Sequence, residues 1–306
     1  LSTLTASMLG TLIAFGLIVF FGFFFFFALA LSSDTTPSVQ PGSVLVLPLE
    51  GTIPERTSDD PFQRLFGDTP DYDLHDLQTA LRNASQDDRI EAVWLRLKGT
   101  NASWGTIEEV RQAVAQVRES GTPVIASSEE FGIGEKEYYV ASAADSVFVG
   151  PQSSFEYNGF ATILAFFQNA FEKLDVEPQV IRAGKFKSAG EPFMRSNLSE
   201  PNRRQLEALL STVNDRFTNT IAEARSLSPT ALETLADENA ILDGATAVNE
   251  GLIDGLRYED EVESLLRSRL GLSPTADMPT ISLRHYKRIS AENAGVTYTG
   301  TGNVAI

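Results

Sequence analysis

Residues 90–130 read IEAVWLRLKGTNASWGTIEEVRQAVAQVRESGTPVIASSEE. IEAVWLRLKG (90–99) and PVIASSEE (123–130) are apolar runs of the length of a β-strand. Between them, TIEEVRQAVAQVRES (106–120) repeats apolar residues at i, i+3 and i+4, which predicts an amphipathic helix with Thr106 as its N-cap. The stretch is therefore expected to form a strand, a helix and a second strand in succession.

The same alternation continues on both sides of this unit. Expected strands are VLVLPLEG (44–51), DSVFVGP (145–151) and EPQVIRAGKFKS (177–188), and expected helices are LHDLQTALRNASQD (74–87), EKEYYVASAA (135–144), LAFFQNAFEKLD (164–175) and a long segment over 201–225. Strands that alternate with helices favour right-handed crossovers and a mostly parallel sheet covered by helices. The fold class is predicted to be α/β.

An apolar run from Met8 to Leu31 precedes this region and is rich in phenylalanine. As a helix it would be roughly 36 Å long, which is enough to cross a bilayer. We interpret residues 1–31 as a transmembrane anchor. A cleaved signal peptide is the alternative, since ALALSS (28–33) offers small residues for cleavage, but the apolar core of such a peptide is shorter.

The remaining boundaries follow from composition. The polar segment 32–43 is predicted to be a linker, residues 44–270 a single α/β domain, and residues 271–306 a linker and the beginning of a further domain. The chain starts at Leu1 and stops in an apolar stretch, so we expect both natural termini to lie outside it. No Lys or Arg precedes Arg56, and flanking charge therefore gives no orientation for the helix.

Composition excludes several classes of function. A net charge of −17 argues against a nucleic-acid partner. The absence of cysteine removes thiolate nucleophiles, disulfides and zinc–thiolate sites. The only histidines, His75 and His285, lack the spacing of a metal site such as HExxH. A Ser-His-Asp triad is also disfavoured, because no nucleophile-elbow sequence occurs. No Gly-rich phosphate loop occurs, and we expect no metal and no cofactor.

One segment carries a family resemblance. RAGKFKSAGEPFMRSNLSEPNRRQLEALL (182–210), together with YYVASAADSVFVGPQSSFEYNGF (138–160) and ILDGATAVNEGLIDGL (241–256), resembles the signal peptide peptidase A (protease IV) family of serine–lysine membrane proteases. The order of these segments matches the amino-terminal half of a long, two-domain member. The resemblance implies the spiral of β–α units that Clp protease and crotonases share.

The resemblance also assigns Lys187 as the catalytic general base. Lys185 alternates with it along an extended segment and would share its face, so spacing alone leaves both open. The register of Lys-Ser-Ala before Glu-Pro-Phe selects Lys187. A neutral amine can take the proton of a serine hydroxyl during attack on a peptide carbonyl, and burial favours the neutral form of a lysine. Phe186 and Phe193 could form an apolar pocket, and Ser188 could orient the amine.

The nucleophile is expected outside this chain. Where single-domain members carry the serine, this sequence has FGIGEKEYYVASAA (131–144), with Glu135 near the serine position. Gly132 and Gly134 could be remnants of a substrate loop, but a backbone requirement explains them better. Glu191 is expected to set the turn after the lysine rather than to act as an acid or base.

The leading interpretation is a membrane-anchored serine–lysine endopeptidase that degrades hydrophobic signal peptides after their cleavage. The resemblance further implies a homo-oligomer at the lipid bilayer, in the cytoplasmic (inner) membrane, with a single pass and an extracytoplasmic globular part. A non-catalytic scaffold half of a crotonase-fold membrane protein remains the alternative. A crotonase-like acyl-thioester enzyme is a third, which the anchor disfavours.

Overall fold

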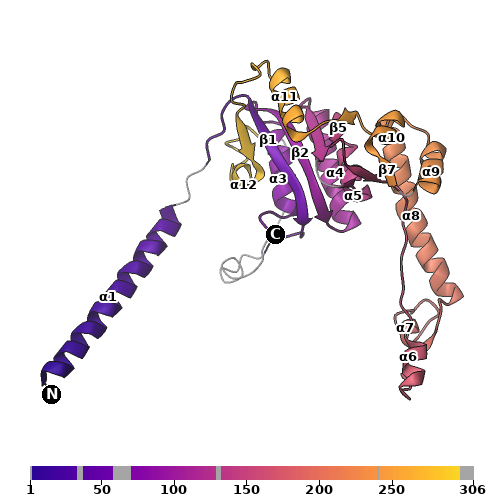
Figure 1. The fold of residues 1–306 in the computed structure, drawn as a ribbon, viewed down its shortest axis with the longest axis horizontal. Coiled ribbons are helices and arrows are strands. Elements are labelled where there is room, and N and C mark those ends of the chain that lie inside the picture. The colour runs from indigo at the N-terminus through magenta and orange to yellow at the C-terminus, as the bar shows by residue number, and fades with distance from the viewer. Residues whose placement is uncertain (1, 33–36, 58–69, 129–131, 240, 297–306) are drawn as a thin grey trace, which may run out of the picture. The chain divides into compact units, whose positions relative to one another are not determined.

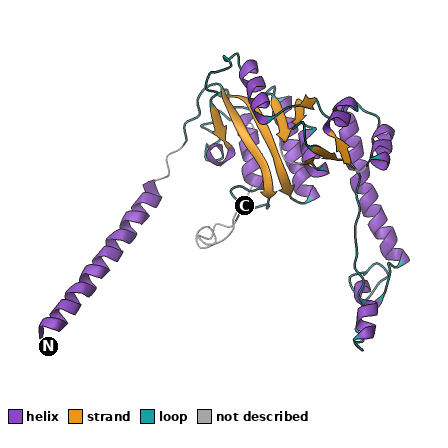
Figure 2. Ribbon diagram, in the orientation of Figure 1, coloured by secondary structure: helices purple, strands orange, loops and turns teal. Residues whose placement is uncertain are grey.

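The computed structural model describes residues 2–32, 37–57, 70–128, 132–239 and 241–296. The chain divides into two compact units, Leu1–Ser38 and Val39–Ile306. Figure 1 shows the elements by label, and Figure 2 shows the distribution of helices and strands.

The first unit consists of the helix α1 (Ser2–Ser32). Residues Leu4–Phe26 have a mean hydropathy of 2.5, and none of this span is buried. The helix contains no charged residue. By length and composition it is able to cross a membrane, which agrees with the apolar run predicted from Met8 to Leu31.

The second unit is built on a six-stranded, entirely parallel sheet in the order β8-β5-β3-β2-β1-β9. Its strands are β1 (Ser43–Thr52), β2 (Ile90–Asn101), β3 (Val124–Ser128), β5 (Ser146–Val149), β8 (Gly255–Leu256) and β9 (Thr280–Ser282). The predicted α/β class with a mostly parallel sheet is thus confirmed. β9 lies within the range that we assigned to a linker and a further domain, and it pairs with β1.

Helices cover both faces of the sheet because successive strand residues point to opposite sides. On one face, Val93 and Leu95 of β2 belong to the main core with α3 (Leu74–Ala84), α4 (Trp104–Glu119) and α5 (Glu135–Ala141). On the other face, Trp94 packs with Val262 and Leu266 of α11 (Glu259–Arg269). The short helix α12 (Leu283–Tyr286) follows β9.

A second, three-stranded sheet has the order β4-β6-β7. It comprises β4 (Gly132–Ile133), β6 (Ser154–Glu156) and β7 (Ile241–Asp243), and α10 (Gly244–Asn249) follows it. β4 is parallel to β6, whereas β7 is antiparallel to it. A Cβ atom on Gly132 would lie 2.5 Å from the Ser154 hydroxyl oxygen, so this glycine serves the pairing of β4 with β6.

Residues 161–210, which we name the arm, leave the sheets and return. The arm contains α6 (Gln168–Lys173), α7 (Glu191–Met194) and the first part of α8 (Glu200–Arg225), and α9 (Pro229–Glu238) follows α8. Figure 1 shows α6, α7 and the start of α8 projecting away from the two sheets. The exposed apolar side chains of the arm include Ile163, Leu174, Ile181, Phe186, Phe193, Met194 and Leu209.

The structure corrects the sequence prediction in three places. The expected strand over 177–188 is irregular, since no strand of the described chain pairs with it. The aromatic helix predicted over 164–175 is limited to α6. The N-cap of α4 is Ser103 rather than Thr106, because the Ser103 side chain accepts a hydrogen bond from the Thr106 amide.

Candidate active site

Lys187 lies in the arm, in the loop between α6 and α7, and its side chain is exposed. Its amide donates to the Gly184 carbonyl oxygen at 3.3 Å, which closes a turn. Among the described residues, none forms a hydrogen bond or an ion pair with its ammonium group. Ser188 therefore does not orient the amine as expected, and the lysine is not desolvated by the part of the chain that the structure describes.

The two phenylalanines of the expected pocket point to different partners. Phe193 stacks on Phe167, with ring centroids 6.4 Å apart, and also packs against Phe171 at 6.2 Å. Phe186 is half exposed and lies under the ammonium of Lys185, 5.2 Å from the ring centroid. Lys185 is therefore held by a cation–π contact. The ammonium group of Lys187 has no such contact among the described residues.

Glu191 follows the lysine and has the most extensive polar contacts in the arm. Its carboxylate accepts hydrogen bonds from the Ser199 amide at 3.1 Å, from the Ser199 hydroxyl, from Asn202 Nδ2 at 3.0 Å and from Arg182 Nη1 at 3.3 Å. Sequence reasoning assigned Glu191 to a turn and did not identify these three partners. The Ser-Glu-Pro start of α8 was the available signal, since serine is a preferred N-cap and proline favours the first helical turn.

Two carboxylates lie at the beginning of α5, near the position where the resemblance predicted that a nucleophile is missing. Glu135 Oε1 accepts from the Asn158 amide at 3.1 Å, and Glu137 Oε1 accepts from the Thr100 amide. Burial raises the pKa of Glu135, and the charges of Glu156 and Glu137 raise it further, against two opposing backbone hydrogen bonds. Neither carboxyl group can be converted by a lysine base into the alkoxide nucleophile of a serine protease.

The next residue of α5, Lys136, is also held by contacts within the chain. Its ammonium donates to the Ala102 carbonyl oxygen at 2.7 Å and lies 5.9 Å from the centroid of the Trp104 ring. The first turn of α5 is therefore occupied by contacts within the chain. Figure 1 shows α5 beside the sheets and α7 out on the arm, so Lys187 and Glu135 are not brought together.

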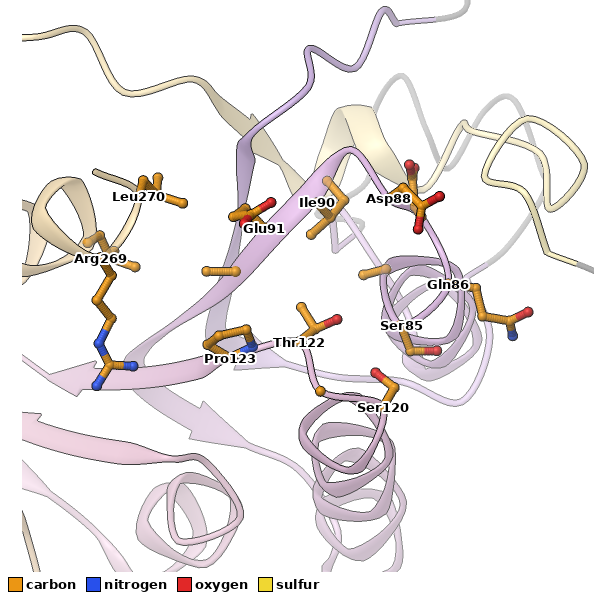
Figure 3. Close-up of a pocket in the computed structure, with 15 residues that line it drawn as sticks. Ser85, Gln86, Asp88, Ile90, Glu91, Ser120, Thr122, Pro123, Arg269 and Leu270 are labelled. Atoms are coloured by element: carbon orange, nitrogen blue, oxygen red, sulfur yellow. The ribbon is translucent and has the colours of Figure 1, made fainter. Parts of the chain in front are cut away.

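A separate cavity of 460 Å³ lies at the amino-terminal ends of β2 and β3. Figure 3 shows Ser85, Asp88, Glu91, Thr122 and Arg269 among the side chains that line it. In open parallel sheets, ligands bind outside the carboxyl ends of the strands. This cavity is at the opposite edge, and Lys187 is not among its lining residues.

Comparison with known proteins bears on the region that contains the lysine. Residues 116–273, which are just over half of the chain, match the sequence profile of Peptidase family S49. The chain belongs to Peptidase family S49. The resemblance to signal peptide peptidase A and protease IV is thereby confirmed.

Two relatives of this chain are considerably longer than the chain itself. It is 30% identical over 269 residues to "Serine protease SPPA, chloroplastic" of Arabidopsis thaliana, covering 88% of this chain and 38% of the relative. It is 31% identical over 227 residues to "Protease 4" of Salmonella typhi, covering 70% of this chain and 36% of the relative. The chain thus spans less than two fifths of either.

The chain is also similar to a shorter relative and to a solved structure. The "Putative signal peptide peptidase SppA" of Enterococcus faecium is 22% identical over 227 residues, covering 74% of this chain and 63% of the relative. Among solved structures, a serine-to-alanine mutant of the 1510-N membrane-bound stomatin-specific protease aligns with a TM-score of 0.46 at 14% identity. That alignment covers 79% of this chain and 97% of the other.

Proposed function

We propose that this chain is the lysine-bearing part of a membrane-anchored serine-type endopeptidase. Lys187 is the general base, and a serine outside these 306 residues is the nucleophile. The observation that carries the proposal is an exposed lysine, without a polar partner among the described residues, within an exposed apolar arm. Membership of Peptidase family S49 supports the reaction class.

The basicity of Lys187 in this proposal depends on the solvation of its amine. A lysine acts as a base only in its neutral form, which a low-dielectric environment favours and bulk water does not. Because the arm exposes Ile181, Phe186 and Phe193, a second protein surface that covers it would bury apolar area and desolvate Lys187 in the same step. The surface that supplies the serine is the natural candidate, since the two groups must come within hydrogen-bond distance.

The substrate class in this proposal is the hydrophobic signal peptide that remains in the membrane after cleavage. The name of the relative from Enterococcus faecium supports it. The α1 helix supports a position at the lipid bilayer. The assignment to the cytoplasmic membrane, with the second unit on the extracytoplasmic side, rests on the resemblance to protease IV and not on the helix. The apolar arm supports assembly into a homo-oligomer.

A second candidate is a non-catalytic scaffold half, in which the chain only supports a catalytic partner. The carboxylates at the start of α5 favour this reading, because they replace a nucleophile without providing another. Under this reading Lys187 has no role in turnover. The two candidates therefore differ in the effect of changing one side chain.

The deciding experiment replaces each lysine in the proteolytically active protein. Lys187→Ala should lower kcat by about 10²- to 10⁴-fold, the scale expected for loss of a positioned general base. Lys187→Arg should be equally inactive, since a guanidinium does not deprotonate near neutral pH. Lys185→Ala is the matched control and should keep most activity. An active Lys187→Ala variant with an unchanged thermal midpoint would instead establish the scaffold reading.

A further inference from the structure

The arm contains one buried residue between residues 161 and 201, all of which the structure describes, and that residue is an acid. Glu191 has 2% of its surface exposed, whereas apolar side chains of the same arm, such as Phe193 and Ile181, are 43% and 102% exposed. Burying a carboxylate while leaving apolar groups in water is the reverse of ordinary folding energetics. The position of Glu191 therefore requires a specific compensation.

Hydrogen bonds provide that compensation. Two of the donors belong to Ser199 and one to Asn202, at the amino terminus of α8, and the fourth is the Arg182 guanidinium. Burial by itself raises the pKa of Glu191, but the hydrogen bonds from Ser199, Asn202 and Arg182 outweigh it and lower the pKa to about 2. The carboxylate is accordingly ionised at neutral pH, and it accepts from every one of these donors.

These contacts fix the segment that carries Lys187 at both of its ends. Arg182 lies before the lysine and Glu191 after it, so their contact closes the loop 182–191. The Glu191 amide also donates to the Ser188 carbonyl oxygen at 2.9 Å. On the other side, the carboxylate attaches the closed loop to the first turn of α8 through Ser199 and Asn202.

We propose that Glu191 is a positioning residue for the Lys187 amine, acting by holding the closed loop 182–191 on the amino terminus of α8. This inference rests on the proposed function, in which Lys187 is the general base. Glu191 touches neither substrate nor the reacting atoms. Its effect on turnover comes from the placement of the lysine alone, because a base that is displaced by about 1 Å can lose about 10²-fold in rate.

The test uses the proteolytically active protein with Glu191→Gln. Glutamine keeps the shape of the side chain but offers one acceptor oxygen, and its NH₂ group faces the donors of Ser199 or Asn202. We expect kcat to fall about 10- to 100-fold while KM stays within about threefold. Glu191→Ala, which removes all of the contacts, should lower kcat at least as far.

The pH–rate profile separates positioning from a general loss of structure. In the assembled active protein, a loop released from α8 no longer holds the amine beneath the covering surface, and an ammonium group in water holds its proton more tightly than one in an apolar environment. The acid limb of the profile in Glu191→Gln should therefore move to higher pH. A variant that had merely lost folded protein would show a lower amplitude at every pH with the limb in place.

Glu200→Gln is the matched control. Glu200 is the next carboxylate along the chain, in the first turn of α8, but it is 66% exposed, and its one ion pair among the described residues is with Arg204, at 3.3 Å. Its kcat and pH profile should equal those of the unsubstituted protein. Lys187→Ala, measured alongside, separates the proposed function from the positioning role of Glu191. If Lys187→Ala is active, the proposed function fails. If Lys187→Ala is inactive while Glu191→Gln is fully active, only the positioning role fails.

Arg182→Met carries the test if Glu191→Gln does not fold. The Arg182 side chain is 43% exposed, so its replacement leaves the core intact while it opens the loop at its first end. We expect kcat to fall about 3- to 10-fold, with the acid limb moving in the same direction. A kcat and a pH profile equal to those of the unsubstituted protein would overturn the proposal.

Discussion

The guanidinium of Arg216, on α8, forms an ion pair with the carboxylate of Glu108, on α4. The Tyr139 hydroxyl of α5 donates to the same carboxylate. Three helices are therefore joined at one acid, close to the place where α8 leaves the main core at Phe217. This contact joins α8 to α4 just beyond the end of the arm, as Glu191 joins the loop 182–191 to the amino terminus of α8.

The first prediction concerns Glu108. The hydrogen bond from Arg216, with those from Tyr139 and Gln112, outweighs burial and lowers the pKa of Glu108 from an ordinary value of 4.5 to about 2. A lowered pKa in the folded state adds stability above about pH 4.5 that is lost as the pH falls towards 2. Glu108→Gln should therefore lower the free energy of unfolding by about 1 kcal/mol at pH 7 and by clearly less at pH 3.

Urea denaturation of the whole chain in detergent, at the two pH values, measures this difference. Glu109→Gln is the control, because Glu109 is the neighbour on the same helix, and its one side-chain hydrogen bond among the described residues is with Gln78, at 2.7 Å. An equal loss of stability for Glu108→Gln at pH 7 and at pH 3 would contradict the conclusion that the ionised carboxylate of Glu108 stabilises the fold.

A second prediction follows from the carboxylates at the start of α5. The 306-residue chain by itself should not cleave a peptide ester, because Glu135 lies near the position expected for the nucleophile and Lys187 is exposed to solvent. The assay is ester hydrolysis by the purified chain. Turnover that persists through further purification and disappears in Lys187→Ala would refute it.

The third prediction concerns α1. A helix with a mean hydropathy of 2.5 over Leu4–Phe26 and no charge should partition into bilayers. The chain should resist carbonate extraction from membranes, and deletion of residues 1–31 should release it into the soluble fraction. If the deleted form stays with the membrane to the same extent, the second unit rather than α1 provides the attachment.

The fourth prediction concerns the packing of Gly190 against Val180. A Cβ atom on Gly190 would clash with Val180 Cγ1. In Gly190→Ala, either Val180 or the loop 182–191 must therefore shift. In the active protein we expect kcat to fall about 10-fold or more, with little change in the thermal midpoint because the arm is outside the core. Val180→Ala should restore activity in the double variant, since it removes the clashing methyl group. Failure of this rescue would show that the contact does not set the loop.

The strands and helices around the main sheet were predictable because their signals are local. β2 alternates Val93 and Leu95 towards one core and Trp94 towards the other, and a pattern with a period of two is visible in any short window. The resemblance in the segment 182–210 likewise depends on contiguous letters. Lys187 could therefore be selected from the sequence, although its role stays a prediction.

The conformation of the arm did not follow from local pattern. EPQVIRAGKFKS (177–188) alternates like a strand, yet a strand exists only where a neighbour offers its amides and carbonyls, and no described strand lies there. The burial of Glu191 depends in the same way on donors of Arg182, Ser199 and Asn202 that meet only after the loop closes on α8. Local periodicity fixes which face of an element is apolar, whereas the place of this polar group is fixed by hydrogen-bond partners 8 to 11 residues away, which belong to no common helix or strand with it.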